Sequence, residues 1–320
     1  MKIKKEKSIL NKVFVVAIFT VLVLYTISLM VPMFWALMTS LKGYNDYSIN
    51  MNVLGFPTLD PENYDNSREQ FFHFKNYQDF FEVFKFSASE IPFWSRDVLL
   101  VHYRRETGVL GMLFNTLLLT ISGAFLQTIG PAIMAYAVSK FNFKLSKIIY
   151  MVALFAMIIP IVGNYPAMLT FLRDARLYDT LIGYLLMKLN FGGMYFFVFC
   201  AFFKGLPNSY AEAAEIDGAS YYRILFSVIL PLSITTLSAV FIIQFVYFWN
   251  DFQTTYMFMR SYPTLMYGLW YNAVAVSAGA LSRITWRMAG GMTLMIPILI
   301  AFIFLKNKLM GNVTMGGLKQ

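Results

Sequence analysis

The chain has 320 residues, of which 58% are hydrophobic and only 13% are charged, and its mean hydropathy is +0.59. These values lie outside the range of soluble globular proteins and indicate a polytopic membrane protein. The formal net charge of +9 does not indicate nucleic-acid binding, because the lysines gather at the N-terminus, in the loop near residues 140–147 and at the C-terminus. Such a distribution reports membrane topology.

Metal and disulfide chemistry find little support in the sequence. The single cysteine, Cys200, excludes an internal disulfide, and it lies in an apolar run where it is expected to be a small buried hydrophobe. His73 and His102 are far apart and have no metal-ligand spacing. No metal site and no catalytic constellation is predicted.

Six apolar runs are long enough to cross a membrane, which takes ~20 residues of helix. The first run follows a basic head and is longer than the apolar part of a signal peptide, so it is interpreted as an uncleaved span. The fourth run is interrupted by Lys188, Asn190 and two glycines, which predicts a short half-helix followed by a span beginning near Gly193. The runs cover residues 13–40, 112–138, 147–171, 181–204, 233–256 and 287–307.

Six spans place both termini on one side of the membrane, and the lysine distribution makes that side the cytoplasm. The expected fold class is therefore all-α, a multi-pass membrane protein with six spans. Three regions follow: a tail and first span at 1–40, an extracellular segment at 41–110, and a core of five spans at 111–320 that contains a cytoplasmic loop at 205–232. Three arginines fall on the outer side with no acid close by in the sequence, namely Arg260, Arg283 and Arg287.

The extracellular segment is expected to hold an amphipathic helix. Tyr77, Phe80, Phe81 and Phe84 follow the i, i+3, i+4, i+7 spacing of one helix face. A small cap packed on the membrane surface, with Phe93 and Trp94 in the aromatic belt, is the favoured interpretation. A docking surface for an external partner is the alternative, since aromatic surfaces often mark interfaces.

One polar segment stands between two apolar runs in the C-terminal half. Tyr210–Asp217 contains three alanines and predicts a short helix, and Gly218 suits the left-handed position after it. Ser220 is expected to cap a second helix, and Pro231 to break the chain before the fifth span. The outcome is a surface helix with alanines facing outward and acids beside them; an ordinary connecting helix is the alternative. The apolar face of the second helix is formed by Ile224, Leu225, Val228 and Ile229.

The order of residues in this segment, Glu212-Ala-Ala-Glu-Ile-Asp217-Gly-Ala-Ser220 and then Leu-Pro-Leu at 230–232, resembles the EAA signature of bacterial ABC importer permeases. The resemblance extends from about Phe74 to the C-terminus. Within the family, the chain is similar to the carbohydrate-uptake branch, the maltose-type second permease. Further stretches similar to that family are His73–Tyr77, Asn115-Thr116, Met157–Pro160 with Pro166, Leu177–Thr180, Gln244-Phe245, Trp249–Phe252, Tyr262–Leu265, Pro297 and Gly311–Lys319.

The resemblance implies a location in the bacterial plasma membrane and a type I ABC importer permease fold, whose cytoplasmic EAA coupling helix inserts into an ATPase subunit. It also implies the partners: a second, related permease, two ATP-binding cassette ATPases, an extracellular solute-binding protein, a sugar substrate and the lipid bilayer. ATP and magnesium would be used by the ATPases and not by this chain, which contains no GxxxxGK[ST] phosphate-binding loop. The implied coupling residues are Glu212, Ala213, Ala214, Glu215, Asp217, Gly218, Ala219 and Ser220.

Polar residues recur along the fifth span and predict one polar face, which a sugar pathway needs because hydroxyls and amides replace water around the sugar. Helix–helix hydrogen bonding is an equal explanation for any single residue. Asp251 is near the outer end of the span, where it would act as a gate or contact a loop. The candidate pathway residues are Asn115, Thr120, Gln244, Tyr247, Asn250 and Asp251.

Three functions remain open on the sequence. The first is an importer permease for a sugar or oligosaccharide, and the second is the same machine carrying a non-sugar or anionic solute such as a glycerol phosphate. The three arginines on the outer side, Arg260, Arg283 and Arg287, are compatible with an anionic cargo. The third is an ion-driven transporter or membrane enzyme working alone, which is disfavoured because internal repeats and midplane charges are not evident.

Overall fold

The computed structural model describes residues 2–49, 51–58, 72–86, 107–141, 143–159, 163–274 and 283–310. Within these ranges the chain is helical apart from one antiparallel pairing of two residues with two, β1 (Lys85–Phe86) with β2 (Thr107–Gly108). The all-α fold class is confirmed. By its internal contacts the chain divides into two compact units: Met1–Phe84 with Tyr271–Met295, and Lys85–Trp270 with Ile296–Gln320.

The first unit begins with one long apolar helix. Side chains from Val13 to Leu37 are mostly exposed, as expected for a helix whose surroundings are lipid or other membrane subunits. The residues that follow it form a buried polar network around Lys42 and Asp46. The helices that begin in this unit are α1 (Lys2–Ser40), α2 (Tyr44–Ser48), α3 (Lys75–Val83) and α15 (Ile284–Met310).

Helix α3 confirms the amphipathic helix predicted for the extracellular segment, with one correction. Phe80 and Phe84 are fully buried against Trp286, at ring-centroid distances of 5.3 and 5.6 Å, and Tyr77 shares a hydrogen bond of 2.6 Å with Ser40. Phe81 instead is 51% exposed, so it does not belong to the buried face. Phe93 and Trp94 lie outside the described residues.

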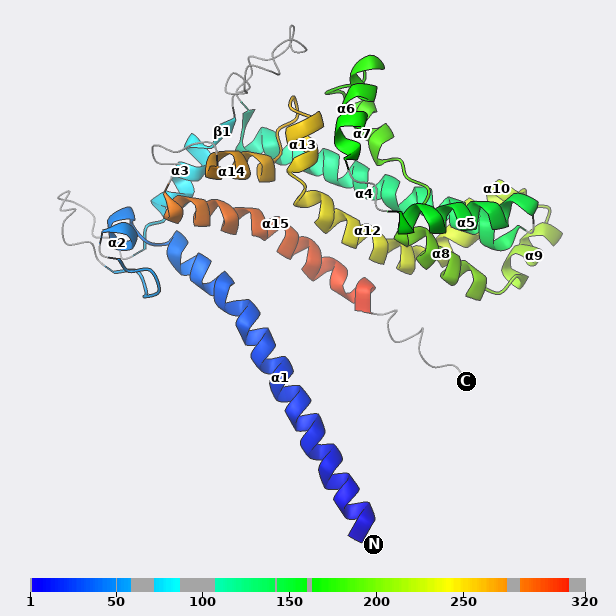
Figure 1. The fold of residues 1–320 in the computed structure, drawn as a ribbon, viewed down its shortest axis with the longest axis horizontal. Helices are drawn as coiled ribbons and strands as arrows, with labels where there is room; N and C mark the ends of the chain where they lie inside the picture. Colours follow the sequence, from blue (N-terminus) through cyan, green and yellow to red (C-terminus); the bar gives the residue numbers. More distant parts are fainter. Residues whose placement is uncertain are drawn as a thin grey trace. The chain divides into compact units, whose positions relative to one another are not determined.

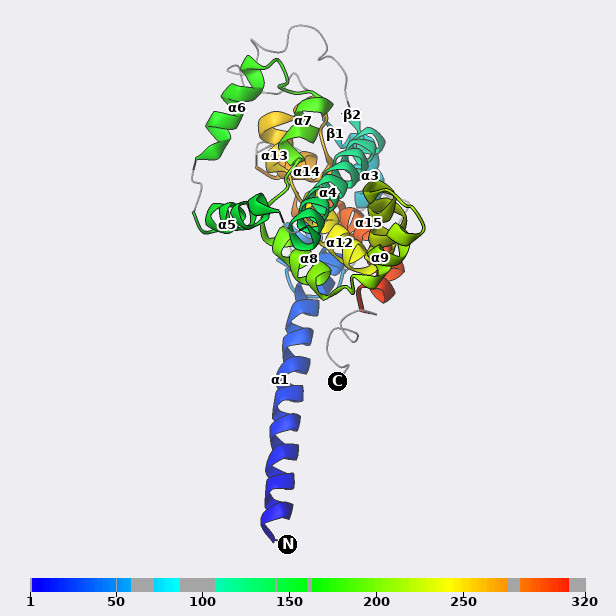
Figure 2. The same ribbon diagram turned by 90° about the vertical axis from the view of Figure 1, so that its right-hand side faces the viewer.

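The second unit is built on α4 (Val109–Lys140), with α8 (Met194–Gly205) and α12 (Ile234–Trp249) packed along it (Figure 1, Figure 2). Small residues on α4 allow close approach of neighbouring elements. A Cβ at Gly123 would lie 2.5 Å from the Tyr184 hydroxyl, and one at Gly130 would lie 2.5 Å from a backbone carbonyl. The remaining helices are α5 (Lys144–Ile158), α6 (Asn164–Asp174), α7 (Leu181–Lys188), α9 (Ser209–Ile216), α10 (Tyr221–Ile224), η3 (Leu225–Ile229), α11 (Leu230–Leu232), α13 (Gln253–Phe258) and α14 (Leu265–Val274).

Three of the six predicted spans are interrupted helices. The third was expected to be continuous over 147–171, but α5 ends at Ile158 and α6 begins after Gly163, which has a left-handed φ of +79°. The fourth is divided into α7 and α8, as predicted. The fifth was expected to run to residue 256, but α12 ends at Trp249. A run of apolar residues indicates a segment buried in the membrane, but it does not indicate where the helix within that segment is broken.

Among the described helices, two are each long and apolar enough to cross a membrane, Lys12–Ser40 and Val109–Lys140. A third span results if Tyr221–Leu232 and Ile234–Trp249, bent by 74° at Ser233, are taken as one. Met194–Gly205 and Ile284–Ile300 are shorter apolar helices.

Candidate coupling surface and membrane polar residues

The segment Tyr210–Ser220 folds as a short helix that ends in a glycine cap. Helix α9 begins one residue before the predicted start, and Gly218 follows it with φ of +80°. The amide of Ala219 donates to the carbonyl of Ala214 at 2.9 Å, and the amide of Gly218 donates to that of Glu215 at 2.9 Å. These two bonds form the Schellman motif, which satisfies helix-end carbonyls and needs a residue tolerant of left-handed backbone.

The second helix is capped by Ser220, as predicted. Its hydroxyl accepts a hydrogen bond of 3.4 Å from the amide of Arg223. The helix continues through the π-helical turn η3 into α11, so the break expected at Pro231 occurs instead at Ser233. Pro231 lies in α11 directly after η3, inside this continuous stretch, and has no amide proton to donate to the preceding turn.

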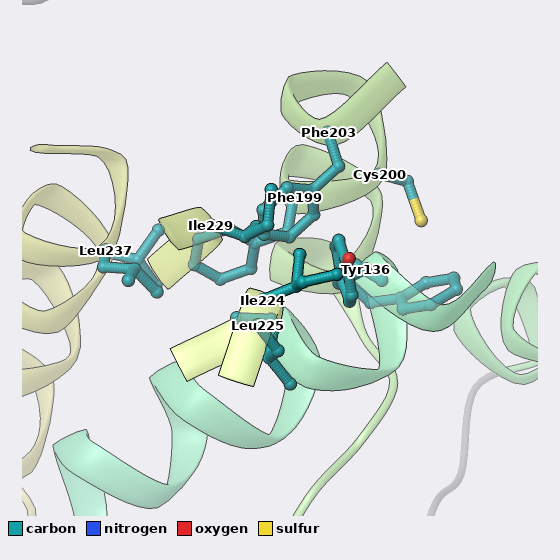
Figure 3. Close-up of a cluster of buried hydrophobic side chains, with 12 residues drawn as sticks. Tyr136, Phe199, Cys200, Phe203, Ile224, Leu225, Ile229 and Leu237 are labelled. Atoms are coloured by element: carbon teal, nitrogen blue, oxygen red, sulfur yellow. The ribbon is translucent and has the colours of Figure 1, made fainter. Parts of the chain in front are cut away.

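An apolar cluster anchors the 205–232 loop to the membrane helices (Figure 3). Ile224, Leu225 and Ile229 are buried between α4, α8 and α12, against aromatic side chains such as Phe203. Burying a side chain of this size contributes ~1.5–3 kcal/mol. Three such residues therefore fix the loop to the bundle as a structural extension of it. The cluster contains Ala132, Ala135, Tyr136, Phe196, Phe199, Cys200, Phe203, Ile224, Leu225, Ile229, Leu237 and Val240, and Cys200 is a buried hydrophobe as predicted.

The alanines of α9 do not all face outward, which corrects the prediction. Ala211 and Ala214 are partly buried and pack against the apolar cluster, because a three-residue step returns to the same helix face. Ala219, in the cap after the helix, packs against the cluster as well. Ala213 is exposed. The small residues therefore allow α9 to lie close to its own bundle, and the outward surface is formed by other side chains.

That outward surface combines acids with large apolar groups. Glu212, Glu215 and Asp217 are exposed, and Ile216 between them is 86% exposed. Tyr222, at the start of the second helix, is 79% exposed. An isoleucine this exposed at a loop tip has no packing role within the chain. Sequence reasoning missed it, although an isoleucine between two acids was a usable signal.

Lys140 ties the loop to the end of α4. Its Nζ donates to the backbone carbonyl of Leu206 and, at 2.8 Å, to Oδ1 of Asn208. From the sequence, Lys140 is interpreted only as evidence of membrane topology. The structure adds that it holds the first residues of the 205–232 loop.

The candidate pathway residues do not share one environment. Gln244 and Thr120 are buried, whereas Tyr247 and Asn250 are exposed. Asn250 ends α12 and its side chain donates to the carbonyl of Val246, in its own helix, at 2.8 Å. The single polar face predicted for residues 244–254 is therefore wrong, because α12 stops before the stripe is complete.

Asn115 and Asp251 contact other parts of the protein. The Asn115 side chain donates to the carbonyl of Pro263 at 3.1 Å. Asp251 forms an ion pair with Lys188 at 3.3 Å, and both side chains are nearly buried, 14% and 12% exposed. The sequence offered a gate or a loop contact for Asp251; its partner in the structure is Lys188 at the end of α7. Sequence reasoning missed the pair, because 62 residues separate two charges that each interrupt an apolar run.

Comparison with known proteins places these features in a family. Residues 127–311, more than half of the chain, match the family described as binding-protein-dependent transport system inner membrane component. A putative ABC transporter permease, ORF2 of Caldicellulosiruptor sp., is 32% identical over 192 residues, covering 58% of this chain and 67% of that protein.

Two further relatives carry more specific names. The probable starch degradation products transport system permease AmyC of Thermoanaerobacterium thermosulfurigenes is 29% identical over 215 residues, or 64% of this chain and 74% of its own length. The sn-glycerol-3-phosphate transport system permease UgpE of Pectobacterium atrosepticum is 32% identical over 178 residues, or 53% and 63%.

The fold is shared with a solved structure. A chain from a bacterial ABC transporter involved in the import of the acidic polysaccharide alginate superposes with a TM-score of 0.63. The alignment covers 93% of this chain and 96% of that one at 18% identity, so it supports the fold alone. Together with the family match over residues 127–311, these findings show that the chain belongs to the binding-protein-dependent transport system inner membrane components, the membrane permeases of ABC transporters.

Proposed function

We propose that this chain is the permease subunit of an ATP-driven importer and forms, with a second related permease, the translocation pathway for a sugar or oligosaccharide. The observation that supports it best is the 205–232 loop, hereafter the coupling loop. This loop lies inside the region that matches the family, is anchored to three membrane helices, and presents acids and an exposed isoleucine at its tip.

The coupling loop transmits mechanical work from two ATPase subunits, which bind ATP and magnesium. Glu212, Glu215 and Asp217 provide charge for the ATPase groove, and Ile216 provides an apolar contact at its centre. Because the apolar cluster joins the loop to α4, α8 and α12, a displacement of α9 is passed to all three helices. The spans then alternate between outward and inward access. The implied coupling residues also include Ala213, Ala214, Gly218, Ala219 and Ser220, which shape the helix and its cap.

The coupling loop and both termini lie in the cytoplasm in this proposal. The basic residues around the loop, Lys140, Lys204 and Arg223, support that orientation, since lysine and arginine collect on the cytoplasmic side. An extracellular solute-binding protein then delivers cargo to the opposite face.

The cargo is proposed to be a carbohydrate because AmyC, a relative over 74% of its length, is named for starch degradation products. A glycerol phosphate is the second candidate, because UgpE is also a relative. Among the candidate pathway residues, Tyr247 and Asn250 are exposed on the end of α12 and support direct contact with cargo. Gln244 and Thr120 are buried, and Asn115 and Asp251 contact other residues of the chain. These four are proposed to hold the helices around the pathway and not to contact cargo directly.

The coupling role is tested by cross-linking in the assembled complex. Cysteine replaces Ile216 or Tyr222 in a Cys200→Ala chain, and cysteines are scanned over the groove of the ATPase subunit. We expect disulfides to form from both positions and their yield to change when ATP is added. Phe171→Cys on α6, 61% exposed, is the control and is expected to give none. A functioning complex with no cross-link from either loop position contradicts the proposal.

A further inference from the structure

Two helix breaks in the membrane region are joined by one ion pair. Lys188 is the last residue of α7, and the chain then runs through Gly193, with φ of +83° and ψ of −173°, before α8 begins. Asp251 lies in the other break, between the end of α12 and the start of α13. Unwound backbone at membrane depth is tolerated only where protein or a water-filled cavity surrounds it, and it often marks the working part of a transporter.

The pair is fully engaged within the protein. Lys188 Nζ donates to Asp251 Oδ2 at 3.3 Å and to Thr254 Oγ1 at 3.0 Å, and it lies 4.7 Å from the ring centroid of Phe248. The carboxylate of Asp251 also accepts from the amide of Thr254 at 2.9 Å and from its hydroxyl at 2.5 Å. Both oxygens of Asp251 therefore accept from Thr254, which ties Asp251 to the first turn of α13.

The pair lies at an intermediate depth along α4. The side chain of Gln127 donates to the carbonyl of Lys188 at 2.9 Å. Gln127 is ~20 Å along the helix from Lys140, at ~1.5 Å per residue, and Lys140 contacts the coupling loop. A charged pair at this depth is costly in a membrane unless it is paired and hydrogen-bonded, and it marks a functional element.

A second carboxylate holds the other end of α7 to the same short helix. Asp179 accepts from the amide of Ser261 at 2.8 Å and from its hydroxyl at 2.6 Å, and its own amide donates to the carbonyl of Phe258 at 3.1 Å. The hydroxyl of Tyr178 donates to the carbonyl of Met257 at 3.2 Å. Helix α7 is thus attached to α13 at both ends, and Figure 2 shows the two helices next to each other.

We propose that Lys188 and Asp251 are positioning residues that make α7 and α13 one gate element, which moves as a single body during transport. The inference rests on the proposed function. Separating the pair would leave two uncompensated charges away from water, at a cost of several kcal/mol each. The two backbone breaks, at residues 189–193 and at Asn250, offer a softer place to bend. The ion pair therefore stays closed while the chain flexes at the breaks.

The test asks whether transport continues while the pair is locked. Lys188→Cys and Asp251→Cys are combined in a Cys200→Ala chain, reconstituted with its partner subunits, and bridged with a short bis-maleimide. We expect the bridged complex to show at least half of the ATP-driven uptake of the wild-type complex, because the bridge replaces the ion pair as the link between α7 and α13. A tenfold or greater loss on bridging, with a monofunctional maleimide on each single cysteine as control, would show that the pair must open and overturns the inference.

Charge reversal gives a second measurement that does not depend on the cysteines. Lys188→Asp and Asp251→Lys alone are each expected to lower uptake at least tenfold and to raise the ATP hydrolysed per cargo molecule. The double reversal is expected to recover uptake to within threefold of the wild type. Unchanged uptake in both single variants, or no recovery in the double variant when the complex assembles normally, contradicts the inference. Absence of ATP-driven uptake in the wild-type complex would instead refute the proposed function.

Discussion

Gly218 determines the shape of the coupling loop because the Schellman cap requires a left-handed residue at this position. A Cβ built at Gly218 meets no atom within 4 Å, so a substitution there is opposed by backbone strain and not by crowding. Asparagine and aspartate tolerate left-handed backbone better than other non-glycine residues, since their short side chains bond locally. The site therefore allows charge to be changed at nearly constant shape.

We expect Gly218→Asp to reduce ATP-driven uptake at least tenfold while membrane insertion is unchanged, because it adds a charge to the surface proposed to enter the ATPase groove. Gly218→Asn is the matched control, of the same size without the charge, and is expected to retain at least half of the uptake. The measurement is uptake into proteoliposomes together with the yield of the assembled complex. Equal uptake by the two variants would show that the added charge is not the cause of the loss.

Asp46 organises the residues after α1. Its carboxylate accepts from the Asn52 side chain at 2.9 Å and from the amide and hydroxyl of Thr58 at 3.0 and 2.5 Å, while the fully buried Lys42 donates to the carbonyl of Asn52 at 2.6 Å. Burial alone raises the pKa of Asp46, but the hydrogen bonds from Thr58 and Asn52 and the charge of Lys42 lower it below its ordinary value.

A lowered folded-state pKa means that Asp46 contributes stability above its unfolded pKa of about 4, and that this stability is lost as the pH falls through the lower folded value. We expect a spin label on Leu54→Cys, an 86% exposed site, to be less mobile at pH 7 than below about pH 4. Asp46→Asn should make the label mobile at neutral pH, through loss of charged hydrogen bonds. An identical pH profile in Glu82→Gln serves as the control.

At the scale of elements, the anchor of the coupling loop is the apolar side of its second helix. Ile224, Leu225 and Ile229 are buried while Phe226, within the same two turns, is 56% exposed. Helix α9 is joined to this anchor through its alanines and through the Schellman cap. Loosening the anchor should therefore reduce the transmission of motion as well as the stability.

We expect Ile229→Ala to lower the free energy of unfolding by ~2–5 kcal/mol, the usual cost of removing a buried side chain of this size. Phe226→Ala, on the exposed side, should change it by less than ~0.5 kcal/mol. Thermal unfolding in detergent is the measurement. In the assembled complex the Ile229 variant should also hydrolyse more ATP per cargo molecule. If the fully assembled variant hydrolyses the normal amount of ATP per cargo molecule, the anchor has only a structural role.

At the scale of the whole molecule, the chain is a membrane subunit of an ABC transporter, and the proposed function takes its energy from partner subunits. The family match and the fold likeness concern the membrane subunit, and the sequence contains no phosphate-binding loop of the GxxxxGK[ST] type. Uptake in this scheme depends on every partner at once. In the proposed importer, the choice of cargo then depends on surfaces that both permeases contribute.

We expect proteoliposomes containing this chain, its companion permease, the ATPases and the binding protein to take up a labelled sugar or oligosaccharide when ATP is present. Omitting the binding protein, or replacing the phosphate-binding lysine of the ATPase, should reduce uptake to background. A panel that includes sn-glycerol 3-phosphate decides between the two cargo classes. Transport restricted to the phosphate ester would exclude the carbohydrate proposal, and coupled transport by the purified chain alone would exclude the importer.

The sequence by itself determined the membrane class, the presence of six apolar runs, the coupling loop with its glycine cap, and the division of the fourth span. These follow from local composition: apolar length, helix propensity and the left-handed residue at Gly218 are properties of short stretches. The likeness to importer permeases rested on the same local order of residues.

Only the tertiary structure decided which faces meet. It turned Ala211 and Ala214 of α9 inward, left Ile216 exposed, ended α12 at Trp249 and brought Lys188 to Asp251. Apolar spans look alike along their whole circumference, so a helical pattern in a membrane protein carries little information about which side is buried in protein. Contacts between residues far apart in the chain depend on how the helices pack, and that packing is a property of the folded molecule.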